Sequence, residues 1–140
     1  METWKHFVVS AILSALIYPV FGWKSLLVIA GGVLIDVDHY FWYAYKYRRY
    51  GLTGCYRHFM KGLEGDNYKH NVGILLVFHT VEFLIMCLLL SVFTDYAMTF
   101  TIGLLSHYIL DLIYLINGPK FFIASTSTIS WLFKNKIQKV

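Results

Sequence analysis

Charged side chains and cysteines are scarce in this chain. Only 14% of its 140 residues are Asp, Glu, Lys or Arg, whereas 58% are hydrophobic, and the mean hydropathy is +0.58. Such a composition is far from that of a soluble globular protein and indicates a membrane protein of one domain. Of the two cysteines, Cys87 lies in an apolar run and Cys55 in a polar stretch, so the sequence predicts neither a disulfide framework nor a Cys-x-x-Cys metal site.

Several catalytic and targeting motifs are also missing. The chain contains no Gly-x-Ser-x-Gly sequence and no Walker or dinucleotide-binding glycine loop, so a serine or cysteine nucleophile has little support. No nucleic-acid motif is present, and we expect no nucleic-acid partner. The first apolar stretch is not followed by a small-residue cleavage pattern, which favours a retained helix over a signal peptide.

Four apolar segments have about the length that a hydrocarbon core of roughly 30 Å requires: residues 6–22, 24–44, 71–93 and 96–117. A polar loop, 46–69, separates the second segment from the third. The last stretch, 120–140, mixes aromatic and aliphatic residues with serine, threonine and lysine, which is typical of an interfacial segment. We therefore expect an all-α fold: one membrane domain over 1–140, an integral membrane four-helix bundle with a cytoplasmic loop and an interfacial C-terminal segment.

The basic residues predict the orientation. With four spans, the N-terminus, the 46–69 loop and the C-terminal tail lie on one side, and every lysine and arginine except Lys24 belongs to that side. By the positive-inside rule this side is cytoplasmic, so the protein is expected in an inner or plasma membrane with both termini in the cytoplasm. The net charge of +4 is then explained by topology and by anionic lipid headgroups.

Ionisable side chains of the four segments gather at one depth. At 1.5 Å per helical residue, they lie between about 18 and 25 Å from the outer ends of the segments. The residues concerned are His6, Asp36, His39, His79, Glu82, His107 and Asp111. Because independent helices could place such residues anywhere, the shared depth predicts a single polar site between the helices.

The spacing of these residues indicates metal binding. Three histidine–carboxylate pairs have i,i+3 or i,i+4 spacing and share a helix face: Asp36 with His39, His79 with Glu82, and His107 with Asp111. Asp38 points about 160° from Asp36 on an ideal helix, so it joins only if the helix ends or distorts there. Such pairs resemble the di-metal sites of helical bundles. With His6, they predict a site for one to three divalent ions, with zinc favoured and manganese or iron as alternatives.

Three of these stretches resemble a known family. GGVLIDVDHY, FHTVEF and GLLSHYILD, with His6 before them, resemble the D-x-D-H turn, H-[ST]-x-E helix and H-x-x-x-D helix of the membrane-bound metal-dependent hydrolases, the YdjM-like family. That family is distantly similar to the zinc-dependent phospholipase C and single-strand nuclease superfamily. The resemblance implies an all-helical fold and a multi-metal phosphoesterase site.

These residues support one hydrolytic chemistry. A divalent ion lowers the pKa of a bound water to about 7 and polarises a phosphoryl oxygen, while Glu82 or Asp38 could serve as general base. Basic residues of the loop could bind the phosphate group: Arg57, His58, Lys69 and His70. The depth of the site indicates membrane lipid as the partner and a lipid or lipid-linked phosphoester as the substrate.

Two other functions remain open from the residues. Intramembrane carboxylates and histidines also line ion and proton paths, although the outer halves of these segments carry no such residues. Alternatively, a structural metal or polar cluster could hold the helices of a non-catalytic membrane protein together. The sequence does not distinguish the second alternative from an enzyme.

Overall fold

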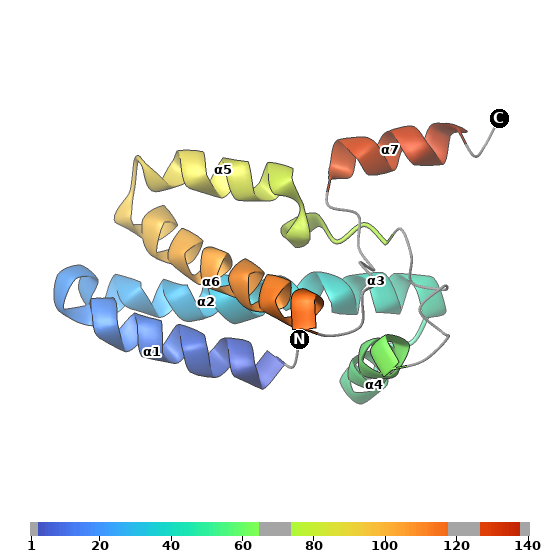
Figure 1. Ribbon diagram of the computed structural model, residues 1–140, viewed down its shortest axis with the longest axis horizontal. Helices are drawn as coiled ribbons and strands as arrows, with labels where there is room; N and C mark the ends of the chain where they lie inside the picture. The colour runs from blue at the N-terminus through green and yellow to red at the C-terminus, as the bar shows by residue number, and fades with distance from the viewer. Residues whose placement is uncertain (1–2, 65–73, 118–126, 138–140) are drawn as a thin grey trace.

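The computed structural model describes residues 3–64, 74–117 and 127–137, and every regular element within them is a helix. The predicted all-α class is therefore confirmed. Helix α1 (Thr3–Phe21) and helix α2 (Leu27–Val33) run antiparallel, and the 3-10 turn η1 (Gly22–Leu26) joins them (Figure 1). Gly22 begins this turn with φ of +55°, a conformation that favours glycine.

The chain then extends away from this hairpin. After the 3-10 turn η2 (Leu34–Asp36), helix α3 (Val37–Tyr47) continues in the direction of α2, and helix α4 (Leu52–Glu64) packs beside α3 (Figure 1). Residues 52–64 of the predicted 46–69 loop are thus a helix. Aromatic contacts between α4 and α3 explain the difference, because an amphipathic segment becomes helical when its apolar face can be covered.

The second half of the described chain contains the 3-10 turn η4 (Val77–His79) and helices α5 (Val81–Ser91), α6 (Asp95–Asn117) and α7 (Thr128–Ile137). Helix α6 contacts α1, α2 and α5, and these helices lie alongside one another (Figure 1). The predicted helix over 71–93 is wrong for residues 74–80, because α5 begins only at Val81. Thr80 caps it by accepting a hydrogen bond from the Phe83 backbone N–H.

Glycines bring α2 and α6 into direct backbone contact. A methyl group on Gly31 would overlap the carbonyl oxygen of Phe100, and one on Gly103 would overlap that of Val28. A methyl group on Gly32 would overlap the hydroxyl of Ser10 on α1. Small residues at these positions allow the close helix packing that is common in membrane proteins.

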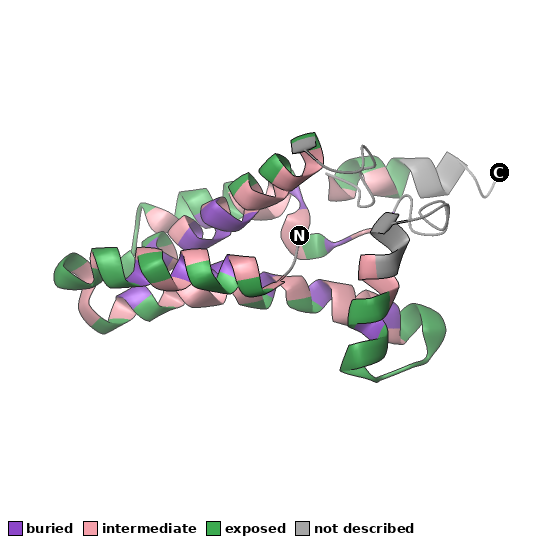
Figure 2. Ribbon diagram, turned by 60° about the horizontal axis from the view of Figure 1, so that its bottom comes forward, coloured by how far each residue is buried: buried purple, intermediate pink, exposed green. Residues whose placement is uncertain are grey.

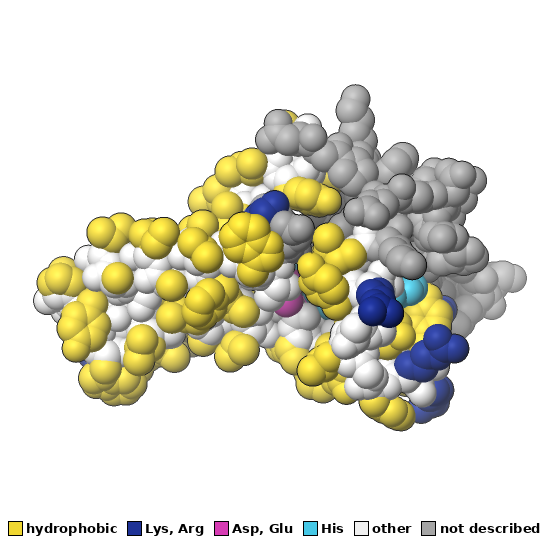
Figure 3. Space-filling view, turned by 90° about the horizontal axis from the view of Figure 1, so that it is seen from below, with side chains coloured by type: hydrophobic (Ala, Val, Ile, Leu, Met, Phe, Trp, Pro, Cys, Tyr) yellow, Lys and Arg dark blue, Asp and Glu magenta, His cyan; other side chains and the backbone are white. Residues whose placement is uncertain are grey.

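The packed helices bury polar side chains beside apolar ones such as Val28 and Leu104, and many other apolar side chains face outward. Leu16, Val20 and Ile116 are 69%, 78% and 69% exposed. Exposed residues recur along the helices (Figure 2), and apolar side chains cover much of the elongated helical part on the face drawn in Figure 3. In contrast, the buried polar residues of α1, η1 and α6 are His6, Ser10, Ser14, Ser25, Thr99, Thr101, Ser106 and His107. This distribution suits helices surrounded by lipid, because apolar patches of this extent are rare on soluble monomers.

Within the part of the chain that the structure describes, two helical runs are long and apolar enough to cross a membrane: Thr3–Tyr47 and Asp95–Ile116. The first run reverses at η1, and the 19 residues of α1 alone span about 28 Å. Helix α5 has 11 residues and spans only about 16 Å. At the η1 end, an ion pair of 2.7 Å between Lys24 and Asp95 joins the tips of the two helical hairpins.

Candidate metal centre

Seven ionisable side chains meet where α1 begins, α2 gives way to α3, and α6 approaches its end. We call these residues the His/Asp cluster: His6, Asp36, Asp38, His39, His79, His107 and Asp111. They form three overlapping groups of three, and in each group the potential ligand atoms lie within 4.8 Å of one another. The prediction of a His/Asp site that could hold a metal ion is confirmed at this level.

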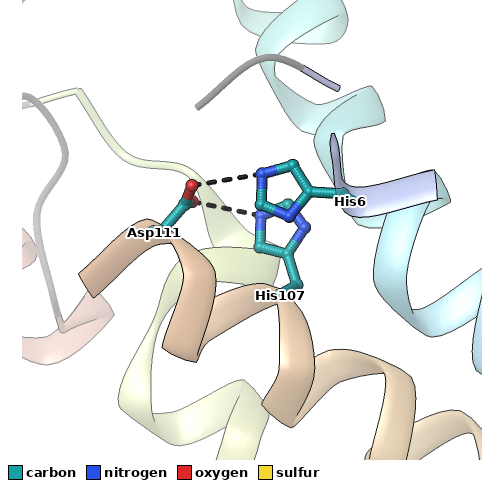
Figure 4. A group of neighbouring side chains, drawn as sticks. All are labelled: His6, His107 and Asp111. Carbon is teal, nitrogen blue, oxygen red and sulfur yellow. Dashed lines mark ion pairs between the residues drawn. The ribbon is translucent and has the colours of Figure 1, made fainter. Parts of the chain in front are cut away.

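The first group is His6, His107 and Asp111 (Figure 4). His6 Nε2 lies 3.2 Å from Asp111 Oδ1, and His107 Nε2 lies 3.1 Å from Asp111 Oδ2. Both histidines are fully buried, and their rings stack 3.9 Å apart at an angle of 17°. Both rings therefore direct Nε2 toward the same carboxylate, and imidazole nitrogens and carboxylate oxygens are common metal ligands.

Within this group, the Asp111 carboxylate is the charged neighbour of His6. Neither of the His6 ring nitrogens forms a hydrogen bond of acceptable geometry with a residue that the structure describes, although the side chain has no exposed area. Buried polar atoms are normally hydrogen-bonded, and an exception requires an explanation such as a bound ion. The position of His6 Nε2 opposite the Asp111 carboxylate supports that explanation.

A backbone hydrogen bond fixes the orientation of His107. Its Nδ1 lies 2.9 Å from the carbonyl oxygen of Gly32. Because a carbonyl oxygen can only accept, Nδ1 carries the proton and Nε2 presents a lone pair to the cluster. Metal-binding histidines commonly have a partner of this kind on the ring nitrogen that does not bind the ion. The close contact of α2 with α6 therefore prepares His107 for ligation.

The middle group is Asp36, His79 and His107. Asp36 Oδ1 lies 3.5 Å from His79 Nε2 and 3.6 Å from His107 Nε2, and the two nitrogens are 3.2 Å apart. Zinc with bonds of about 2.0–2.1 Å and tetrahedral geometry separates its ligands by about 3.3–3.4 Å. These three atoms thus have the spacing of three corners of a zinc tetrahedron.

The third group is Asp38, His39 and His79. Asp38 Oδ1 lies 3.0 Å from His39 Nδ1, and Asp38 Oδ2 lies 3.0 Å from His79 Nδ1. Asp38 joins the cluster because the helix distorts just before it: Val33 has φ of −127°, and the 3-10 turn η2 follows. The angle of about 160° that an ideal helix would place between Asp36 and Asp38 therefore does not apply.

The structure places Glu82 outside these three groups. Its carboxylate accepts hydrogen bonds from the Ser127 hydroxyl and from the backbone N–H groups of Thr128 and Ile129, at the start of α7. The expectation that Glu82 shares a helix face with His79 is wrong, because His79 precedes the helix that contains Glu82. Glu82 instead caps the N-terminus of α7, where the helix dipole favours negative charge.

Of the four residues predicted to bind phosphate, two can be located. Arg57 is exposed on α4. His58 packs among the aromatic rings of α3, with its ring 4.8 Å from that of Tyr47 and 6.2 Å from that of Trp42. Lys69 and His70 lie outside the described residues. Helix α4 reaches the cluster through Phe59, whose ring lies 4.8 Å from that of His39.

Tyr108 supports the cluster, although no spacing in the sequence pointed to it. Its hydroxyl donates a 2.7 Å hydrogen bond to the carbonyl oxygen of Phe78, next to His79. The Phe78 backbone N–H in turn donates to Asp38 Oδ2 over 3.1 Å. Tyr108 thus ties the η4 turn, which carries His79, to α6. Its position directly after His107 was the one available signal.

No protein-family model matches the chain, and no curated protein and no solved structure is significantly similar to it. The resemblance to the membrane-bound metal-dependent hydrolases therefore stays a prediction. The geometry of the His/Asp cluster and its position in an apolar helical protein are the features that bear on function.

Proposed function

We propose that this protein is a membrane-embedded metal-dependent hydrolase that acts on a phosphoester of a lipid or lipid-linked substrate. The observation that carries the proposal is the convergence of four histidines and three aspartates from separate parts of the chain into groups with metal-ligand spacing. A bound divalent ion supplies Lewis acidity and activates water for hydrolysis. Zinc is the favoured ion, with manganese and iron as alternatives.

The orientation of the histidines favours ion binding over a network that serves packing alone. A packing network satisfies its buried polar atoms with well-oriented hydrogen bonds, whereas the fully buried His6 forms none with the described residues and only faces the Asp111 carboxylate at 3.2 Å. The tautomer of His107 also directs its free lone pair toward two aspartates. Since Glu82 caps α7, the carboxylates proposed as general base are Asp36 and Asp38, which belong to the cluster.

The surroundings of the cluster support a substrate at the membrane interface. One side of the cluster is continuous with the apolar helices, and lysine and arginine side chains gather on the other side around α3 and α4 (Figure 3). We propose that the helices cross the membrane four times, with α5 as a shortened crossing, and that the basic end lies in the cytoplasm, in agreement with the positive-inside rule. The exposed Arg57 can then bind the phosphate group of a substrate at headgroup depth.

Elemental analysis tests the metal centre directly. The full chain is purified in detergent, dialysed against zinc or manganese, and compared with a His107→Ala, Asp111→Ala double variant and with His58→Ala as a matched control. We expect metal in the wild type and the control and a reduced content in the double variant. An absence of metal from all three would refute the hydrolase proposal and favour a proton path or a polar packing network.

Turnover tests the proposed chemistry. The metal-loaded protein in lipid nanodiscs is incubated with phosphatidic acid and with phosphatidylglycerol, and released phosphate and glycerophosphate are measured. We expect hydrolysis of at least one lipid that is lost on chelation and returns on adding the metal. Metal binding without turnover of any phosphoester lipid would leave a structural metal protein.

A further inference from the structure

The three groups of the His/Asp cluster overlap in an uneven way. The first group (His6, His107, Asp111) and the third group (Asp38, His39, His79) share no residue. In the middle group, only Asp36 belongs to no other group. His107 is shared with the first group and His79 with the third. The number of ions that can bind at once therefore depends on which ring nitrogen of His79 and of His107 is available to each group.

His107 has one lone pair to offer. Its Nδ1 donates to the Gly32 carbonyl oxygen, so the first and middle groups both require Nε2. One lone pair binds one ion, and these two groups consequently exclude each other.

His79 faces two groups with different nitrogens. Nδ1 lies 3.0 Å from Asp38 Oδ2 in the third group, and Nε2 lies 3.5 Å from Asp36 Oδ1 in the middle group. A neutral imidazole has a lone pair on one nitrogen and a proton on the other. When Nδ1 binds an ion, the Nε2–H lies 3.2 Å from His107 Nε2 and 3.5 Å from Asp36 Oδ1. Once the lone pair of His107 Nε2 binds the ion of the first group, Asp36 is the remaining acceptor, and a carboxylate in this position orients a metal-binding histidine.

We propose that the protein binds two divalent ions at once, one in the first group and one in the third, and that Asp36 orients His79 without binding either ion. This inference rests on the proposed metal centre and assigns its stoichiometry and ligands. The position of His6 agrees with it, because the first group gives this fully buried imidazole a ligand role. With Asp38 used as a ligand, Asp36 is the cluster carboxylate that stays available as general base.

The test counts zinc ions bound per full-length protein in detergent. Each protein is equilibrated by dialysis at a fixed free zinc concentration, and metal and protein are then measured by mass spectrometry and amino-acid analysis. We expect two equivalents in the wild type, one in His6→Ala and one in His39→Ala. Asp36→Asn keeps two equivalents, with an affinity lower by about 10–100-fold because an orienting partner is lost. The control His58→Ala also keeps two.

The fold of each variant is checked by circular dichroism and gel filtration. If a variant misfolds, a second variant of the same group replaces it. Asp111→Asn replaces His6→Ala as the change in the first group, and Asp38→Asn replaces His39→Ala in the third. Three equivalents or a single equivalent in the wild type would overturn the inference. A loss of one ion from Asp36→Asn, or the retention of two by the folded variants of the first or third group, would also overturn it.

A wild-type protein that binds no metal would contradict more than the stoichiometry. In that case the metal centre itself is absent, and the proposed function fails together with the inference. Any nonzero stoichiometry other than two removes only the assignment of ions to groups. A cobalt titration gives an independent readout: the visible d–d absorption should rise to two equivalents in the wild type and to one in His6→Ala.

Discussion

Replacing Gly103 with alanine should weaken both the fold and metal binding, although Gly103 is not a ligand. The new methyl group would overlap the Val28 carbonyl oxygen and lie 2.9 Å from the Gly32 backbone nitrogen. Since backbone atoms cannot turn away, α2 and α6 must separate by about 1 Å to restore van der Waals contact. Overpacking of this kind costs typically about 1–3 kcal/mol of unfolding free energy.

The same movement should reach the metal centre. A displacement of about 1 Å would stretch the 2.9 Å bond from His107 Nδ1 to the Gly32 carbonyl oxygen beyond hydrogen-bonding range. Loss of such an orienting partner lowers metal affinity by about 10–100-fold. We therefore expect Gly103→Ala to lower the free energy of unfolding and to raise the zinc dissociation constant together.

The free energy of unfolding is measured by SDS titration with circular dichroism as the readout. The zinc dissociation constant is measured by competition with a chromophoric chelator. Gly51→Ala serves as the matched control, because a methyl group there meets nothing within 4 Å. Unchanged stability in Gly103→Ala would refute the close packing of α2 and α6. Reduced stability with unchanged zinc affinity would refute the link from helix packing to His107.

Three further predictions concern other parts of the molecule. Glu82→Gln should weaken the attachment of α7, so hydrogen exchange of residues 128–137 should increase, and exchange rates equal to those of the wild type would contradict the capping role. Chelation of the metal should lower the thermal midpoint, since an ion at 100 times its dissociation constant stabilises by about 2.7 kcal/mol; a midpoint that ignores both chelator and zinc would contradict a metal centre. In intact cells, a membrane-impermeant thiol reagent should label Trp23→Cys and not Tyr50→Cys, both exposed, and the opposite pattern would reverse the proposed orientation.

The location of the cluster could be predicted from the sequence because helix rise converts residue number into depth. His6, Asp36, His107 and Asp111 lie on helices or at their ends, and residue counting from the outer turns brings them to one level. The structure places all four in the His/Asp cluster. The all-helical class followed from composition and apolar segment length in the same way.

Local breaks in the helices explain why the positions of Glu82 and Asp38 were not predicted correctly from the sequence. An ideal helix over 71–93 would have aligned His79 with Glu82, but the Thr80 cap begins a new helix between them. An ideal helix over 24–44 would have turned Asp38 away from Asp36, but the 3-10 turn η2 alters that angle. A threonine before an apolar run with glutamate in its first turn is a helix-start signal, and it indicated the first of these breaks.

The exposure of many apolar side chains and the burial of small and ionisable ones determine where the sequence of this fold can vary. An outward position such as Leu16 or Ile116 has only to be apolar, so several side chains satisfy it equally well. An inward position such as Ser10 or Gly31 tolerates one narrow size, and the cluster positions require one particular chemistry. What distinguishes this protein from other apolar helical chains therefore resides in a few small and ionisable residues, and its relatives are to be recognised by those rather than by their hydrophobic segments.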